Sequence, residues 1–148
     1  LSTVLLLNGP NLNLLGKREP HLYGETTLKE IESNFKKSAV AFGLVADCIQ
    51  SNSESILIES VHAASSKGTE AIVINPGAYG HTSVALRDAF LGTGLPFVEV
   101  HLSNVFAREE FRSRSLLSDI AIGLISGFGE KSYDLGLQAI LAYLQKNK

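Results

Sequence analysis

Hydrophobic positions along this chain alternate between short apolar runs and longer amphipathic runs. The short runs are almost continuously apolar, as is typical of parallel β-strands that are covered on both faces. They predict five strands, at residues 3–8, 44–50, 71–75, 96–102 and 120–126.

The longer runs predict helices that separate these strands. In the first of them Leu28, Ile31 and Phe35 recur at spacings of three and four, which places them on one helix face. Thr82 or Ser83 is the expected N-cap of the third helix. The predicted helices cover residues 27–42, about 54–67, 82–92 and about 131–146.

Strands that alternate with helices in this way predict βαβ units and a parallel sheet. The 148 residues are enough for one hydrophobic core, and no linker or internal repeat divides them, so a single domain is expected over residues 1–148. We therefore expect an α/β fold, a flavodoxin-like three-layer sandwich with a five-stranded parallel sheet.

Composition and charge narrow the functional classes. The net charge is −2 and the basic residues are scattered, so a nucleic-acid partner is not expected. Charged residues make up 19% of the chain, below the average of about 25%, which favours a surface partly covered by other subunits. No apolar run approaches the length of a membrane span and no signal peptide is visible, so a cytoplasmic protein without a membrane partner is expected.

The single cysteine, Cys48, lies in an apolar run and is expected to be an inert buried thiol. No Cys/His cluster has zinc spacing, so no metal is expected.

Polar residues gather where the predicted strands end. Asn8 ends the first strand, and residues 9–24, GPNLNLLGKREPHLYG, are too long for a plain turn before a helix. Asn75 ends the third strand, and Glu99 and His101 lie at the end of the fourth. Ligands of open α/β sheets bind beyond the carboxyl ends of the strands, so this edge is the expected site.

Several cofactor sites are excluded by the sequence. No G-x-G-x-x-G follows the first strand, and GFGEKS at 127–132 lacks the spacing of a phosphate-binding loop. No lysine lies inside an apolar strand, so a desolvated Schiff-base lysine is not expected. What remains is acid–base chemistry without a cofactor.

Glu99 and His101 are two residues apart on one strand, so their side chains point to the same face. A carboxylate beside an imidazole fixes its tautomer and stabilises its protonated form, which suits a general acid. The alternative is a buried pair with a purely structural role.

Tyr23 and Arg18 lie together in the long segment. A free tyrosine has a pKa near 10, and lowering it by two units requires about 2.7 kcal/mol of differential stabilisation. The permanently charged Arg18 can contribute stabilisation of that order in a water-poor site. On the residues alone, an arginine and a tyrosine in a loop are more often surface side chains.

His81 precedes a predicted helix N-terminus, where amides and hydroxyls could bind a carboxylate, although Thr82 and Ser83 could act only as caps. Arg112, in REEFRSR, could hold an acidic or hydroxylated substrate or form a solvated salt bridge.

Four motifs closely resemble the type II 3-dehydroquinate dehydratases, in the same order and spacing through nearly the whole chain. They are LLLNGPNLNLLGKREPHLYG, QSN, INPGAYGHTSVALRDA and EVHLSNVFAREEFR. The resemblance implies a flavodoxin-like enzyme without metal or cofactor. Its reaction is an anti elimination of water from 3-dehydroquinate through an enolate, in the shikimate or quinate pathway.

The resemblance also implies residue roles. Tyr23 is the base and Arg18 keeps it anionic, while His101, oriented by Glu99, protonates the departing hydroxyl. Asn11 stabilises the enolate through a water molecule. The substrate-binding positions are Asn75, His81, Leu102, Ser103 and Arg112, with Asp88 supplied by a neighbouring subunit of a homo-oligomer, a dodecamer of four trimers.

The sequence departs from the family pattern without losing a catalytic position. Gly80 stands where threonine is frequent, and Phe106, Ser113, Arg114 and Leu116 are unusual. Two other functions stay open: a non-catalytic module that binds a small acid or a protein, and a lyase for another cyclic hydroxy acid. Retention of all five of Arg18, Tyr23, Glu99, His101 and Arg112 argues against the former.

Overall fold

The sheet of the protein has five strands, all parallel, in the order β2-β1-β3-β4-β5. The structure is a computed structural model that describes residues 1–17, 19, 21 and 24–147. This strand order is that of flavodoxin-like folds, which confirms the predicted fold class. The strands are β1 Ser2–Asn8, β2 Leu44–Gln50, β3 Ala71–Asn75, β4 Phe97–His101 and β5 Gly123–Ser126.

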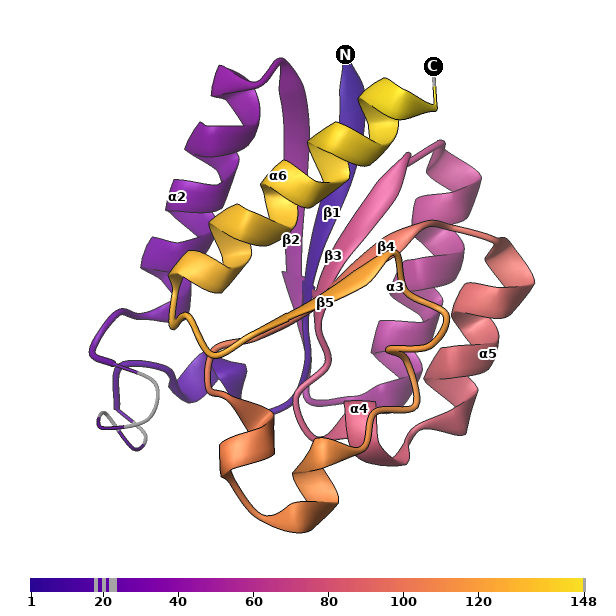
Figure 1. Cartoon of the computed structure of the whole chain (residues 1–148). Helices are drawn as coiled ribbons and strands as arrows, with labels where there is room; N and C mark the ends of the chain where they lie inside the picture. Colours follow the sequence, from indigo (N-terminus) through magenta and orange to yellow (C-terminus); the bar gives the residue numbers. More distant parts are fainter. Residues whose placement is uncertain (18, 20, 22–23, 148) are drawn as a thin grey trace.

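Helices cover both faces of the sheet and make the outer layers of the sandwich (Figure 1). On one face lie α2, Leu28–Ala41, and α6, Lys131–Lys146. On the other lie α3, Glu54–Lys67, and α5, Val84–Thr93. Shorter elements follow the strands at the carboxyl edge: η1 Leu12–Leu14, α4 Tyr79–Thr82, η2 Val105–Ala107 and η3 Glu110–Ser113.

Each face of the sheet carries its own hydrophobic core. Along β1, Val4 and Leu6 pack towards α2 and α6, while Leu5 and Leu7 pack towards α3 and α5. This alternation follows from the two-residue period of a strand. Because both faces of the strand are buried, its central positions Val4–Leu7 are all apolar.

Side-chain hydroxyl groups cap α2 and α5 at their starts. The Thr27 hydroxyl accepts a hydrogen bond from the Glu30 amide at 3.2 Å, which caps α2, and donates one to the Glu30 carboxylate at 3.1 Å. The Ser83 hydroxyl accepts from the Leu86 amide at 2.9 Å and caps α5. Of the two expected caps for this helix, Ser83 is therefore the one used.

The predicted fifth strand was too long, because β5 begins only at Gly123. The amides of Ile120 and Ala121 both donate to the Leu117 carbonyl at 3.1 Å, so the first half of this apolar run is a turn. Leu117 is fully buried in the α3/α5 core. The run is apolar because it packs on that core from a loop, which periodicity does not distinguish from a strand.

The thiol of Cys48 lies on β2 and is half-buried, so the expectation of full burial was too strong. Burial and the nearby charge of Glu32 raise the pKa of this thiol to about 12. Because the thiolate is the reactive form, the thiol is inert at neutral pH, as predicted.

The loops that follow β1 and β3 interlock beside the topological switch point of the sheet. The Gly9 amide donates to the Asn75 carbonyl at 2.8 Å. A Cβ atom on Gly9 would lie 2.3 Å from the Pro76 carbonyl oxygen, so this contact admits only glycine. The contact holds the two loops together at the carboxyl ends of β1 and β3, where ligands of such folds bind.

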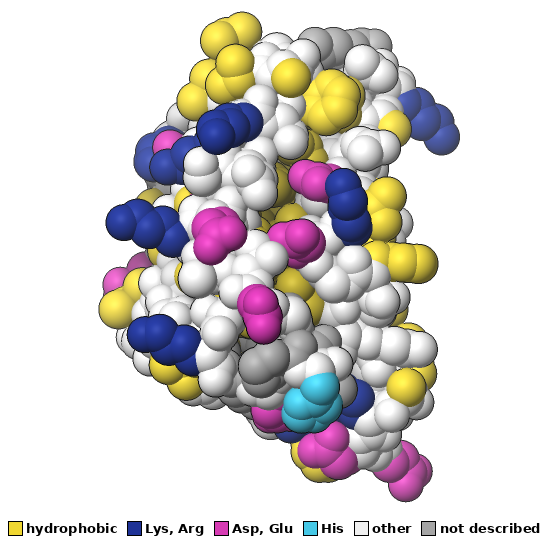
Figure 2. All heavy atoms as spheres, turned by 90° about the vertical axis from the view of Figure 1, so that its left-hand side faces the viewer, with side chains coloured by type: hydrophobic (Ala, Val, Ile, Leu, Met, Phe, Trp, Pro, Cys, Tyr) yellow, Lys and Arg dark blue, Asp and Glu magenta, His cyan; other side chains and the backbone are white. Residues whose placement is uncertain are grey.

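The surface over α2 and α6 carries acidic and basic side chains intermixed, with apolar side chains in the hollow between the helices (Figure 2). Within the described residues, no helix is both long and apolar enough to cross a membrane.

Replacing Gly9 by alanine should destabilise the fold by about 1–3 kcal/mol, because the added methyl group overlaps the Pro76 carbonyl. Denaturant unfolding of the variant measures this loss. Gly92→Ala is the matched control: a methyl group added at Gly92, in α5, would meet nothing within 4 Å, so alanine should be neutral or slightly stabilising there. Equal stability of the two variants would contradict the interlocked contact.

Candidate active site

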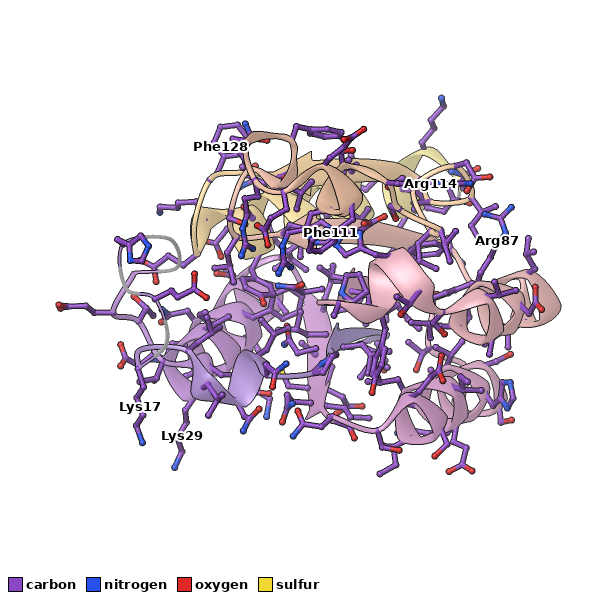
Figure 3. The ribbon with its side chains drawn as sticks, turned by 90° about the horizontal axis from the view of Figure 1, so that it is seen from below. Lys17, Lys29, Arg87, Phe111, Arg114 and Phe128 are labelled. Carbon is purple, nitrogen blue, oxygen red and sulfur yellow. The ribbon has the colours of Figure 1, made fainter. Side chains whose placement is uncertain are left out.

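A pocket of about 180 Å³ lies at the carboxyl ends of β1, β3 and β4. Figure 3 views the molecule from this edge. The pocket brings together seven of the residues predicted from the sequence: Asn11, Asn75, His81, His101, Leu102, Ser103 and Arg112.

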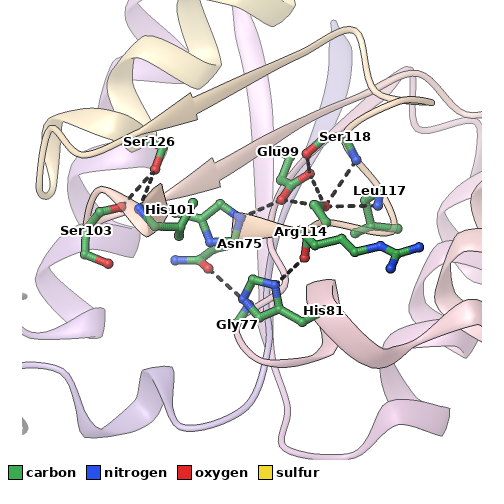
Figure 4. A network of polar contacts seen from close by, with 12 residues as sticks. Asn75, Gly77, His81, Glu99, His101, Ser103, Arg114, Leu117, Ser118 and Ser126 are labelled. Atoms are coloured by element: carbon green, nitrogen blue, oxygen red, sulfur yellow. Dashed lines mark hydrogen bonds and ion pairs between the residues drawn. The ribbon is translucent and has the colours of Figure 1, made fainter. Parts of the chain in front are cut away.

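Glu99 and His101 form a buried pair on β4. Glu99 has no exposed surface and His101 is 7% exposed. The His101 Nε2 atom lies 2.5 Å from the Glu99 Oε2 atom (Figure 4). An ionised carboxylate only accepts hydrogen bonds, so the Nε2 atom carries the proton of this contact. The Nδ1 atom is then the ring nitrogen left for proton transfer.

Two serines complete the surroundings of Glu99. The Ser115 hydroxyl lies 2.9 and 3.0 Å from the two carboxylate oxygens, and the Ser118 hydroxyl lies 2.7 Å from Oε1. Burial by itself raises the pKa of Glu99, but the hydrogen bond and positive charge of His101 and the two hydroxyls together lower that pKa below its usual value. Glu99 is therefore a stable anion that can hold a charged His101.

His81 provides a second imidazole in the same pocket. Its Nδ1 atom lies 2.7 Å from the Arg114 carbonyl oxygen, which only accepts, so Nδ1 carries a proton and Nε2 is left for a ligand. The ring stacks on that of His101, with centroids 6.3 Å apart and planes at 18°. His81 thus lies in α4, beside the acid–base pair.

Asn11 lines the pocket from the loop after β1. Its φ of 67° is left-handed, a conformation that asparagine tolerates better than most residues. The Asn11 amide donates to the Asn52 side chain at 3.0 Å, which ties this loop to the one that follows β2. The position of Asn11 is therefore fixed by its backbone.

Two guanidinium groups give the pocket positive charge. The Nε atom of Arg112 donates to both carboxylate oxygens of Glu109 at 3.2 Å, so Arg112 forms the salt bridge that was the alternative. It also lines the pocket. Arg108 was not singled out from the sequence. Its side chain is 11% exposed, lines the pocket and donates from Nη1 to the Ser103 hydroxyl at 3.4 Å. These charges suit an anionic or hydroxylated ligand.

No lysine contributes to the pocket within the part of the chain that the structure describes. Lys17 and Lys29 point outward on the α2 side (Figure 3). In the same described residues, no three His, Cys, Asp or Glu side chains group as metal ligands would.

The structure does not place every predicted site residue in the pocket lining. Arg18 and Tyr23 lie outside the described residues, so the structure does not test their roles. Asp88 is exposed on α5 and does not line the pocket. Ser83 is 1% exposed and its hydroxyl caps α5, so the capping alternative holds for this residue.

Sequence reasoning missed Arg108, which lines the pocket, and three residues that support it from behind: Ser115, Ser118 and Tyr133. Arg108 lies four residues before Arg112 in the basic cluster REEFRSR, so its spacing was a usable signal. The serines lie in a loop without periodicity, and only the folded contacts relate them to Glu99.

Known proteins similar to this chain share one description. The family model that matches, over residues 2–141, is dehydroquinase class II. The chain is 57% identical to a 3-dehydroquinate dehydratase of Xanthomonas euvesicatoria over 147 residues, 99% of each chain. It is also 57% identical to one of Prochlorococcus marinus over 144 residues, 97% of this chain and 96% of the other.

A solved structure gives the same result. The crystal structure of type II dehydroquinase from Propionibacterium acnes superposes with a TM-score of 0.91 at 39% identity, covering 96% of this chain and 97% of that one.

Removing the Ser118 hydroxyl should make stability less dependent on pH. In the wild type, the lowered pKa of Glu99 contributes stability above its ordinary value of 4.5, and this contribution is lost as the pH falls through the folded-state pKa. Ser118→Ala moves that pKa upward. The free energy of unfolding should drop by about 1.5–3 kcal/mol at neutral pH, and the difference from wild type should vanish in acid.

Denaturant unfolding at several pH values measures this difference. Ser113→Ala is the control, because the Ser113 hydroxyl donates to the exposed Glu110 carbonyl at 2.6 Å and not to Glu99. A difference for Ser118→Ala that is independent of pH would contradict the assigned role.

Proposed function

Because the chain belongs to the class II dehydroquinase family, we propose that it removes water from 3-dehydroquinate to give 3-dehydroshikimate. It is a hydro-lyase. The observation that best supports the proposed chemistry is the buried Glu99–His101 pair in a pocket lined by positive charge.

His101 is the general acid of the proposed reaction. Glu99 holds the imidazole through Nε2 and stabilises its positive charge, which leaves Nδ1 to give its proton to the departing hydroxyl. When that carbon–oxygen bond breaks, the bonding electrons leave with the oxygen, and the added proton makes the product water. The enolate electrons form the new carbon–carbon double bond.

Tyr23 is the proposed base, and as tyrosinate it takes the proton from the carbon beside the ketone. The fixed charge of Arg18 lowers the pKa of this phenol. Support comes from the segment that carries both residues: it begins in the pocket wall at Pro10, Asn11 and Leu12. An added Cβ on Gly16 would lie 2.9 Å from the Glu25 carbonyl oxygen, so the two described residues that flank the stretch carrying Arg18 and Tyr23 lie close together.

The remaining pocket residues have proposed roles in binding. Arg112 holds the carboxylate or hydroxyls of the substrate, together with Asn75, His81, Leu102 and Ser103. Asn11 stabilises the enolate through a water molecule. These groups are donors and cations, as a hydroxylated cyclic carboxylate requires.

The proposed assembly is a dodecamer of four trimers, in which Asp88 contributes to a neighbouring subunit's site. The exposure of Asp88 on α5 is compatible with this role. The proposed pathway is shikimate, which leads to aromatic amino acids, or quinate. Light scattering with and without ligand measures the assembly.

A steady-state assay with 3-dehydroquinate, following the enone product by its ultraviolet absorbance, tests the activity directly. Turnover is expected, and a folded sample without turnover would overturn the proposal.

Tyr23→Phe should lower kcat by about 10²–10⁴-fold with substrate binding largely retained, because only the base is lost. Tyr143→Phe, on α6, is the control, and full activity of Tyr23→Phe would remove Tyr23 from the base role.

Borohydride added together with substrate should leave the activity intact. The proposed reaction forms no imine, and no lysine of the described residues lines the pocket. Residual activity after gel filtration is the measurement. Progressive inactivation that depends on substrate would identify a lysine in the reaction.

A further inference from the structure

Three polar side chains meet on the sheet face opposite to Glu99. Asn8 and Asn75 lie side by side at the ends of β1 and β3, and Tyr133 reaches them from the first turn of α6. They are 0%, 3% and 1% exposed. Buried polar groups this close to a pocket, with no part in the proposed acid–base steps, require an explanation.

The Gly77 backbone fixes the direction of every hydrogen bond in this group. Its N–H donates to one side-chain atom of Asn75 at 3.2 Å, so that atom is the oxygen. The Asn75 nitrogen therefore faces Tyr133 and donates to the phenol oxygen at 3.0 Å. The phenol proton is then directed to Asn8, whose oxygen accepts it at 2.7 Å.

This order leaves the Asn8 amide nitrogen, with its two N–H groups, without a partner among the described residues. This Nδ2 atom is buried. Turning the Asn8 amide over would direct two donors at the phenol oxygen and leave the phenol proton without an acceptor. The fold thus keeps an unsatisfied donor at Asn8 and retains the orientation of Asn75.

Gly136 allows the phenol to reach the strand ends. A Cβ atom at this position would lie 2.9 Å from Val100 Cγ1 and 3.1 Å from Val73 Cγ1, so glycine lets α6 pack closely against the sheet here. Tyr133 lies one turn earlier on the same helix. The close packing therefore serves the contact between Tyr133 and Asn75.

We propose that Tyr133 is a positioning residue, whose phenol oxygen fixes the Asn75 amide so that its second N–H faces the pocket. Asn75 lines that pocket and has this one N–H to offer. The group it recognises is an acceptor oxygen, a hydroxyl or carboxylate of the substrate. This inference rests on the proposed dehydration of 3-dehydroquinate.

Tyr133→Phe tests the proposal, since it removes the acceptor and keeps the ring. KM for 3-dehydroquinate should rise about tenfold with kcat within about twofold, because a binding contact is lost in ground and transition states alike. A purely structural role would instead lower the active fraction, and so kcat, without moving KM. Tyr143→Phe, further along α6, should match the wild type.

A pair of variants makes the test specific to Asn75. Asn75→Ala should raise KM by itself, and adding Tyr133→Phe should raise it no further, because both changes remove one contact. Additive effects would overturn the inference. Wild-type protein without turnover would instead overturn the proposed function, so the two failures are distinguishable.

Asn8→Ala is the second variant, should Tyr133→Phe not fold. It removes the acceptor of the phenol proton together with the unsatisfied Nδ2 donor, and it leaves Tyr133 and the packing of α6 unchanged. The phenol proton, which has lost its acceptor, then disturbs the hydrogen bond that the phenol oxygen accepts from Asn75. The Asn75 amide is held less firmly, so KM should rise with kcat retained. An unchanged KM in this variant would overturn the inference.

Discussion

The site depends on the burial of Glu99. A carboxylate with no exposed surface stays ionised only when donors surround it, and here His101, Ser115 and Ser118 supply them. The requirement fixes the two-residue spacing on β4 and also the course of the loop that carries both serines. That loop is tied to α4 by the Leu116 amide, which donates to the Gly80 carbonyl at 2.7 Å. The negative charge of Glu99 therefore determines where His101 and the loop with both serines lie beside the pocket.

The sheet separates two polar groups that serve the same pocket. The Glu99 group lies on the α3/α5 side and is charged, while the Asn8, Asn75 and Tyr133 group lies on the α6 side and is neutral. Both groups lie at the carboxyl ends of strands, where the pairing of the strands ends and where ligands of such folds bind. One group is suited to proton transfer and the other to holding the ligand in place.

Much of this arrangement could be predicted from the chain. Continuous apolar runs identified β1 and β3, and the spacing of Leu28, Ile31 and Phe35 identified α2, because periodicity is a local property. The contacts of Ser115 and Tyr133 could not be predicted, since they join residues far apart in sequence.

Some errors had the same local origin. Apolar character around Ile120 predicted a strand where a turn packs on the core, because hydrophobicity reports burial and not backbone conformation. The roles of Arg18 and Tyr23 came from resemblance and not from pattern, since an arginine and a tyrosine in a loop are ordinary surface residues on composition alone.

The central claim is an elimination in which acid and base act from opposite sides of the substrate, His101 from β4 and Tyr23 from the segment after β1. The most direct test uses 3-dehydroquinate carrying deuterium stereospecifically on the carbon beside the ketone, with the product read by mass spectrometry. The deuterium anti to the departing hydroxyl should be lost and the syn deuterium retained. Loss of the syn deuterium would contradict this arrangement of acid and base.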